Sequence, residues 1–406
     1  MRFNKFGGVA LAAVFLATAV PQAVAQQPAA VQVSKAMVGP MNEARAAIVA
    51  KDFATAKAKL DQAAALVKIP QERLAVEQLR VSYAANAGDS AALVAAVDAM
   101  VATKLMTPAD LKPYKAAIPE AYGKLGDTAK SLAASKAFLE EYGGTHEQYF
   151  ALARDYLKAN DSASAITNAN KAIDMAKSGG AKAPEPYYKL LMLAHKSAND
   201  MGNYYATEER LVAEYPNEVY WRELIARVQN MPGYGYETRL DMFRTLDAAK
   251  VKLSKDEKNI AASEALKHGL PNEALQILEP AIASGELAGN AEAEKNLKDA
   301  KQLSAEDKVN LAKDTPGIVS KGTATAIAKT GEAYLSYGDN AKAIELIQQA
   351  LTKGLTGEEA ELAKLHLGIA QFRSGQKEAA QATWGGIKDG IPGVLAHNWV
   401  VISNLK

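Results

Sequence analysis

The sequence predicts an all-α protein, a solenoid of about ten helical hairpins. A short turn mark recurs about every 36 residues, with an amphipathic segment on each side of it. Alanine, the best helix former, supplies 81 of the 406 residues. The alternating runs of β-branched residues that are typical of strands are absent. A period of this length is typical of repeat arrays, in which each hairpin buries its apolar face against its neighbours.

The turn marks are short and mostly combine a Gly or Asn with a following Asp. They are Lys51-Asp52-Phe53, Gly88-Asp89-Ser90, Gly126-Asp127-Thr128, Asn160-Asp161-Ser162, Asn199-Asp200-Met201, Gly269-Leu270-Pro271, Gly338-Asp339-Asn340 and Gly375-Gln376-Lys377. Two gaps, 200–270 and 270–339, are about twice the period, so each is expected to hide one divergent hairpin. We expect the first to turn at residues 231–234, between helices 220–228 and 239–249. We expect the second to turn near Leu303-Ser304, after a charged helix over 291–301.

The first 25 residues have the pattern of a secretory signal peptide. Arg2 and Lys5 precede an apolar run over 9–20, which ends at Ala23-Val24-Ala25. The run is too short to span a bilayer as a mature helix, although an N-terminal membrane anchor is the alternative interpretation. Cleavage near Ala25 would give a periplasmic or secreted protein with no membrane span in the mature chain. Residues 26–40 are expected to be a flexible lead-in, and residues 41–406 a single solenoid with degenerate units near 188–250 and 285–320.

Composition excludes several classes of function. The chain has no cysteine, which excludes disulfides, thiolate metal sites and thiol nucleophiles. Its formal net charge is +1, which argues against nucleic acid as a partner. The five histidines lie in different repeats and no pair has the i, i+4 spacing of a helical zinc site, so no metal and no other cofactor is expected.

Three short strings are those of a penicillin-binding serine enzyme, namely Ser374-Gly375-Gln376-Lys377, Ser197-Ala198-Asn199 and Lys329-Thr330-Gly331. Their order along the chain is reversed, and Lys329-Thr330-Gly331 falls in an expected helix instead of a strand. The sequence therefore predicts that the protein is not an enzyme.

Small residues recur at one position in the second helix of each hairpin. Five of the eight are alanine, namely Ala56, Ala165, Ala274, Ala343 and Ala380. In the unit around Ala165, the first helix carries Tyr149, Leu152, Ala153 and Tyr156. This spacing of aromatic and small residues resembles the tetratricopeptide repeat (TPR), and the whole chain resembles exported repeat proteins of Gram-negative bacteria. The resemblance implies a right-handed superhelix with a concave groove and implies no chemistry; the divergent unit with Tyr204 in the small-residue slot departs from it.

The groove that the resemblance implies is lined by one stripe of each first helix. In two neighbouring units this stripe carries Phe150, Arg154, Leu157 and Lys158, then Lys189, Leu193 and Lys196. An acidic segment or a terminal carboxylate of a partner is expected to bind there, with Phe150, Arg154, Lys158, Lys189, Leu193 and Lys196 as the binding residues. The alternative is that these lysines are ordinary solvated residues.

Tyrosines gather in one part of the chain, with 11 of the 16 between Tyr142 and Tyr236. They indicate either a binding surface or thicker packing at a divergent joint. Together these patterns favour an exported, non-enzymatic scaffold that binds a peptide or protein of the cell envelope. The alternative is a helical module that binds envelope glycan or a small ligand, or that assists a peptidoglycan-acting enzyme. The sequence does not specify the oligomeric state.

Overall fold

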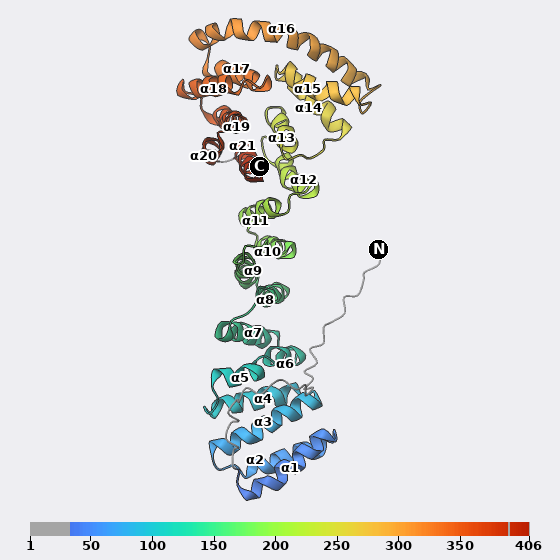
Figure 1. Ribbon diagram of the computed structural model, residues 1–406, viewed down its shortest axis with the longest axis vertical. Helices are drawn as coiled ribbons and strands as arrows, with labels where there is room; N and C mark the ends of the chain where they lie inside the picture. The colour runs from blue at the N-terminus through green and yellow to red at the C-terminus, as the bar shows by residue number, and fades with distance from the viewer. Residues whose placement is uncertain (1–32, 389, 406) are drawn as a thin grey trace, which may run out of the picture. The chain divides into compact units, whose positions relative to one another are not determined.

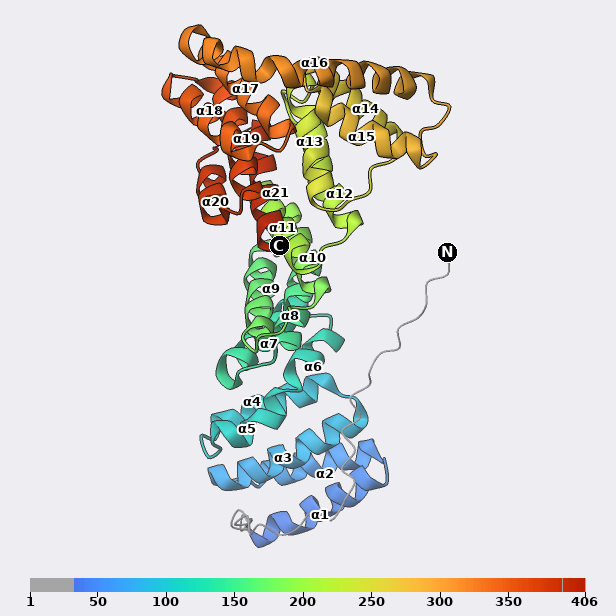
Figure 2. The ribbon, with the colours of Figure 1, turned by 45° about the horizontal axis from the view of Figure 1, so that its top comes forward.

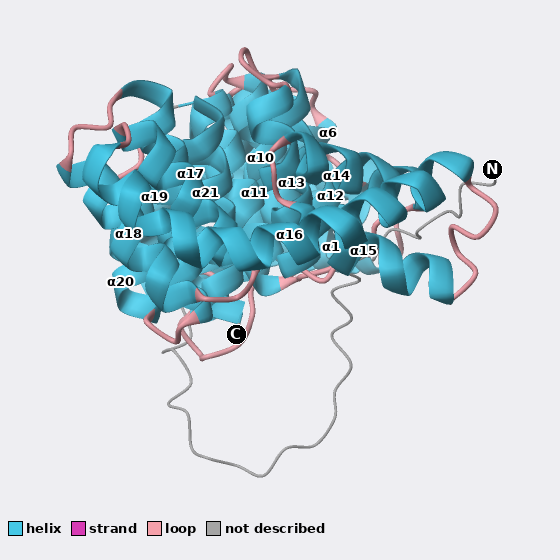
Figure 3. Ribbon diagram, turned by 90° about the horizontal axis from the view of Figure 1, so that it is seen from above, coloured by secondary structure: helices cyan, strands magenta, loops and turns pink. Residues whose placement is uncertain are grey.

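The computed structural model describes residues 33–388 and 390–405, so the predicted signal peptide and residues 26–32 lie outside the described residues. This described part contains 21 α-helices and one 3₁₀-helix. Figure 3 shows no strand in it, and the predicted all-α solenoid is confirmed. The chain divides into two compact units, Met1–Gly143 and Gly144–Lys406. A single solenoid over 41–406 stays a prediction. None of the described helices is both long enough and apolar enough to cross a bilayer.

The described part of the first unit, residues 33–143, contains seven helices. They are coloured blue to teal in Figure 1. They are α1 (Lys35–Val49), α2 (Phe53–Ala65), α3 (Pro70–Ala87), α4 (Ser90–Ala102), α5 (Pro108–Lys115), α6 (Ile118–Lys124) and α7 (Thr128–Tyr142). Helix α1 includes residues 35–40, which corrects the expectation of a flexible lead-in up to residue 40. The reason is packing, because Met37 and Met41 are buried in one cluster with Ala63 of α2 and Val76 of α3.

The second unit holds the remaining helices. They are α8 (His146–Lys158), α9 (Ser162–Lys177), α10 (Glu185–Ser197), α11 (Met201–Glu214), α12 (Glu218–Ala226), the 3₁₀-helix η1 (Arg227–Asn230), α13 (Tyr236–Ala248), α14 (Lys255–Lys267), α15 (Pro271–Ala283), α16 (Ala291–Lys321), α17 (Ala324–Ser336), α18 (Asn340–Thr352), α19 (Gly357–Arg373), α20 (Lys377–Gly385) and α21 (Gly390–Leu405).

Each of the eight turn marks joins the two helices of one hairpin, and its residues explain the turn. The first residue of every mark has a positive φ, between 57° and 80°, which ends the first helix in the left-handed region. The second residue is the N-cap of the next helix. In the six marks with Asp at this place, its carboxylate accepts a hydrogen bond of 2.9–3.2 Å from the backbone N–H three residues later. The recurring pair therefore encodes both ends of the turn.

The structure differs between the two long gaps in the series of turn marks, 200–270 and 270–339. In the first, α12 and η1 are followed by a turn with Gly233 at φ 86° and then by α13, where the sequence predicts a divergent helix pair. The second expectation is wrong, because α16 continues for 31 residues through Leu303 and Ser304. Residues 291–315 contain neither Gly nor Pro, and Ser304 is buried with its hydroxyl 3.3 Å from the hydroxyl of Tyr337. In Figures 1 and 2, α16 extends from α15 to α17.

The second unit also contains packing contacts between helices that are far apart in the sequence. Helix α21, next to α20 in sequence, packs not only on α19 and α20 but also on α11 and α13. Its Trp399 stacks on Trp384 of α20, with ring centroids 5.7 Å apart. Both indoles lie in a core that also contains Trp221 of α12 and Phe243 of α13. Its last helix therefore packs against α11 and α13, which lie far earlier in the sequence.

Candidate binding sites

The α8–α10 face is defined by the six residues that the sequence predicts as a groove, Phe150, Arg154 and Lys158 on α8 and Lys189, Leu193 and Lys196 on α10. The two helices pack on each other. Phe150 stacks on Tyr187 of α10, with ring centroids 4.3 Å apart and an interplanar angle of 14°. Tyr187 is buried, and its hydroxyl lies 2.9 Å from Nδ1 of His146. One edge of this face is thus an interhelical aromatic contact.

Three of the four positive charges of this face have partners within the chain. Arg154 and Lys158 both lie close to Asp155, at 3.3 and 3.5 Å. Lys189 forms a 2.6 Å ion pair with Glu185 and lies over the ring of Tyr220. Lys196 is exposed and has no ion pair among the described residues. Leu193 is 55% exposed.

Most tyrosines of the Tyr142–Tyr236 segment take part in packing or hydrogen bonds. The Tyr188 hydroxyl donates to Glu214 at 2.7 Å, and the Tyr215 hydroxyl donates to the Ala183 carbonyl at 2.7 Å. Tyr236 stacks on His268 with ring centroids 4.2 Å apart. These contacts support the interpretation of the tyrosines as packing residues, although Tyr236 stays partly exposed.

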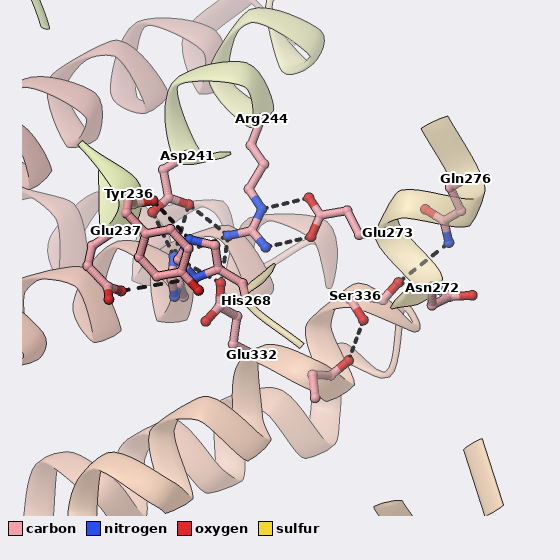
Figure 4. A network of polar contacts seen from close by, with 12 residues as sticks. Tyr236, Glu237, Asp241, Arg244, His268, Asn272, Glu273, Gln276, Glu332 and Ser336 are labelled. Carbon is pink, nitrogen blue, oxygen red and sulfur yellow. Dashed lines mark hydrogen bonds and ion pairs between the residues drawn. The ribbon is translucent and has the colours of Figure 1, made fainter. Parts of the chain in front are cut away.

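A buried ionic cluster, which the sequence analysis misses, lies inside the second unit (Figure 4). It consists of Asp241 and Arg244 of α13, Glu273 of α15, Glu332 of α17 and His366 of α19. Arg244 donates to Asp241 and to Glu332, at 2.8 Å each. Its Nε and second Nη donate to the two carboxylate oxygens of Glu273, at 2.7 and 2.5 Å. The His366 Nε2 lies 2.9 Å from Asp241.

The charges of the ionic cluster stabilise one another against burial. Burial alone would raise the pKa of Asp241, but the positive charges of His366 and Arg244 hold it well below its ordinary value. Burial would likewise lower the pKa of His366, whereas Asp241 and Glu332 raise it. Every member is bonded to another, so the ionic cluster joins four helices rather than presenting a free acid or base.

A sequence signal for the ionic cluster exists, although it is weak. Asp241 and Arg244 are spaced i, i+3, and they stand among the apolar residues Leu240, Met242, Phe243 and Leu246. Charges on the apolar side of a helix are expected only where partners meet them. The partners Glu273, Glu332 and His366 come from distant hairpins, and no spacing in the sequence points to them.

Two cavities flank the ionic cluster. The larger, of about 630 Å³, is lined from α13, α14, α15, α17 and α19 and includes Arg244 and Glu273. The smaller, of about 180 Å³, includes Glu332 and His366 and is rich in carboxylates. No group of three or more His, Asp or Glu side chains in the described part of the chain has the geometry to hold a metal ion.

The enzyme-like string Lys329-Thr330-Gly331 lies in α17, a helix. A Cβ on Gly331 would lie 2.7 Å from Cγ1 of Ile347, so the glycine allows α18 to pack closely against α17. The Thr330 hydroxyl donates to the carbonyl of Ala326 within the same helix. These residues are explained by helix packing.

No protein-family model matches this chain, and no curated protein matches it. Among solved structures it is similar to a tetratricopeptide repeat protein from Parabacteroides merdae ATCC 43184, at 12% identity over 83% of this chain and 100% of the other, with a TM-score of 0.29. It is also similar to the APC/C hetero-tetramer Cut9–Hcn1, at 13% identity over 89% of this chain and 66% of the other, with a TM-score of 0.21. The hairpins described above define the class, a TPR-like helical-repeat protein; the low TM-scores add nothing to that assignment.

Proposed function

We propose that this chain is an exported, non-enzymatic scaffold that binds a peptide or protein of the cell envelope on its α8–α10 face. The observation that supports this proposal is Leu193, a 55% exposed leucine among four positively charged side chains. An apolar anchor inside a polar rim is the usual anatomy of a protein-binding surface.

The charge of the α8–α10 face favours an acidic partner. It holds four positive side chains, Arg154, Lys158, Lys189 and Lys196, and the two acidic neighbours Asp155 and Glu185 leave an excess of two positive charges. These ion pairs are exposed, and exposed pairs contribute only about 0–1 kcal/mol. A carboxylate of the partner can therefore replace Asp155 or Glu185 at little cost.

The bonding of the buried titratable groups is also consistent with a scaffold. Asp241 and His366, which have shifted pKa values, are bonded to each other at the centre of the second unit. The ionic cluster is explained by its role in holding helices together.

Affinity capture from envelope extract tests the binding face. The bait is the wild-type mature chain, and the test variant is Arg154→Glu with Lys189→Glu. The matched control, Lys308→Glu with Lys313→Glu, makes the same change of charge on exposed residues of α16. We expect the test variant to weaken binding of the captured partner at least about tenfold, because both contacts become repulsive. Equal affinity of the test variant and the control, with unchanged helical content by circular dichroism, rejects the face.

Export is tested separately by mass spectrometry of the protein from its native host. The apolar run and the motif Ala23-Val24-Ala25 predict a mature chain that begins at Gln26. An intact Met1 terminus in the native protein rejects this part of the proposal and leaves the binding face to be judged on the capture experiment.

A further inference from the structure

We propose that the 630 Å³ cavity of the second unit, here called the inner cavity, binds a small apolar carboxylate, with the carboxylate on Arg373 and the apolar part against Phe243, Ile277, Leu335 and Ile369. The site is separate from the α8–α10 face and does not depend on the function proposed for it.

The inner cavity is a built space between helices and not a shallow surface depression. Its volume of about 630 Å³ lies within the range of about 300–1,000 Å³ that is typical of small-molecule sites. Five helices, α13, α14, α15, α17 and α19, contribute to the lining. These are the helices that the closure of the second unit and its ionic cluster bring together.

Arg373, the last residue of α19, is the member of the lining that points to an anion. Its side chain is exposed, and no described residue forms an ion pair or a hydrogen bond with it. Desolvation by the surrounding protein and the positive charge of Arg244 lower the pKa of its guanidinium, and the negative charges of Glu273 and Asp247 offset this only in part. An arginine near another cation and without a hydrogen-bonded anion is stabilised when a carboxylate binds, because the planar guanidinium matches a carboxylate with two parallel hydrogen bonds.

The other charges of the lining are balanced within the chain. Arg244 holds Glu273 through two hydrogen bonds. Lys258 forms an ion pair with Glu286. The remaining lining charges are those of Lys252, Arg373 and Asp247, so the cavity carries one unbalanced positive charge. A ligand with one negative charge neutralises it.

Half of the residues that line the inner cavity are apolar, so the part of the ligand beyond its carboxylate is expected to be apolar as well. Phe243, Leu335 and Ile369 are largely buried and border the space, and Ile277 and Pro280 lie on α15 beside it. Contact with such a wall stabilises an alkyl or aromatic group by about 25 cal/mol for each Å² removed from water. An apolar body with one carboxylate thus fits both parts of the inner cavity.

Calorimetric titration of the full mature chain tests the proposal, with octanoate as the probe and octanol and octylammonium as probes of the same length. The dipeptide acetyl-Leu-Leu tests the other source of the same chemistry, a peptide C-terminus. We expect octanoate or the dipeptide to bind, and octanol and octylammonium to bind at least about tenfold more weakly. Whichever of octanoate and acetyl-Leu-Leu binds more tightly shows whether an alkyl carboxylate or a peptide C-terminus is the better ligand. If neither acid binds at millimolar concentration, the proposal is wrong.

Substitutions of lining residues test whether the ligand binds in the inner cavity. Arg373→Gln removes the charge and is expected to weaken binding about tenfold to a hundredfold, whereas Arg373→Lys keeps part of the affinity. Gln276→Trp, an exposed residue of the lining, is expected to block the cavity. Thermal unfolding checks that each variant is folded. The control Lys313→Gln removes an equivalent charge on α16 and is expected to bind like the wild type.

One further comparison separates the two sites. The double variant Arg154→Glu/Lys189→Glu is expected to bind octanoate like the wild type, because both residues lie on the α8–α10 face. Loss of octanoate binding in this variant, or unchanged binding in a folded Arg373→Gln, overturns the inference and leaves the capture experiment unaffected.

Discussion

The Nε2 atom of His366 lies 2.9 Å from Oδ1 and 3.0 Å from Oδ2 of Asp241, although 125 positions separate the two residues. This contact joins α19 to α13, and Arg244 extends it to Glu273 on α15 and Glu332 on α17. A linear repeat array is stabilised by interactions between adjacent units. The second unit adds a central ionic cluster, so its hairpins are expected to unfold together.

The stability of the second unit is predicted to depend on pH through His366. The carboxylates of Asp241 and Glu332 outweigh the effect of burial and raise the pKa of His366 above its ordinary value of 6.5. Because the folded pKa is the higher one, protonated His366 contributes fully below about pH 6.5, and the contribution is lost as the pH rises through the folded pKa. The pKa of Asp241 is lowered, so its contribution is present above about pH 4 and is lost as the pH falls.

Urea unfolding at several pH values checks this prediction. The three tryptophans of the chain, Trp221, Trp384 and Trp399, all lie in the second unit, so their fluorescence reports on it alone. We expect the free energy of unfolding to decrease above neutral pH in the wild type. In His366→Gln it is expected to be lower throughout and to lose this decrease. An identical alkaline decrease in the variant contradicts the assignment to His366.

Arg244→Met is predicted to destabilise the second unit by about 3–5 kcal/mol, because it leaves the buried Asp241 and the partly buried Glu273 and Glu332 without their common cation. Lys301→Met is the control. It breaks an ion pair with Glu279 in which both side chains are more than half exposed, and such a pair contributes at most about 1 kcal/mol. Tryptophan fluorescence in urea measures both. Similar losses in the two variants would mean that the buried cluster adds no stability beyond that of a surface pair.

Gly368 and Gly317 are predicted to respond in opposite ways to alanine. A Cβ on Gly368 would lie 2.2 Å from Nε1 of Trp384, a fully buried indole that donates to the Leu365 carbonyl. Gly368→Ala is therefore expected to destabilise by about 1–3 kcal/mol. A Cβ on Gly317, near the C-terminal end of α16, meets nothing within 4 Å. Gly317→Ala is expected to stabilise by about 0.5–1 kcal/mol, because alanine loses less backbone entropy in a helix. Stabilisation by both substitutions contradicts the close approach of α19 and α20.

The hairpins could be predicted from the sequence because their signals are local. A residue in the left-handed region and a capping Asp are adjacent in the chain, as in Asn160-Asp161, and they set the turn without help from distant residues. The buried alanines Ala165 and Ala343 are likewise set by the spacing within one hairpin.

The features that escape prediction depend on distant residues. The pairing of Asp241 with His366, the return of α21 to α11 and the inner cavity all require the positions of several hairpins in space. At Leu303-Ser304 the sequence instead predicts a turn that does not exist. The gap between the turn marks at 270 and 339 is about twice the period, so a helix pair was expected there, but α16 is one continuous helix. For the α8–α10 face, the sequence placed Phe150 beside α10 but did not reveal that Asp155 and Glu185 pair with three of its four positive charges.

Gln376→Asp is predicted to stabilise the second unit by about 0.5–1 kcal/mol. Gln376 is the N-cap of α20, with φ −91° and ψ 61°, and its side chain forms no capping hydrogen bond. Asp339, at the equivalent place before α18, has φ −77° and ψ 71° and accepts a 3.1 Å hydrogen bond from the Lys342 amide. The backbone at Gln376 is thus close to one that an aspartate already caps, and the carboxylate adds a favourable interaction with the helix dipole.

The matched variants for this prediction are Asp339→Ala and Gln376→Ala. The first removes an existing cap and is expected to cost about 0.5–2 kcal/mol, whereas the second removes a side chain that makes no capping bond and is expected to be close to neutral. Urea unfolding followed by tryptophan fluorescence measures all three, since Trp384 lies in α20 itself. The part due to the helix dipole is expected to shrink in 1 M salt, where charges are screened within about 3 Å. If Asp339→Ala is costly and Gln376→Asp brings no gain, the turn before α20 does not share the cap geometry of the other hairpins.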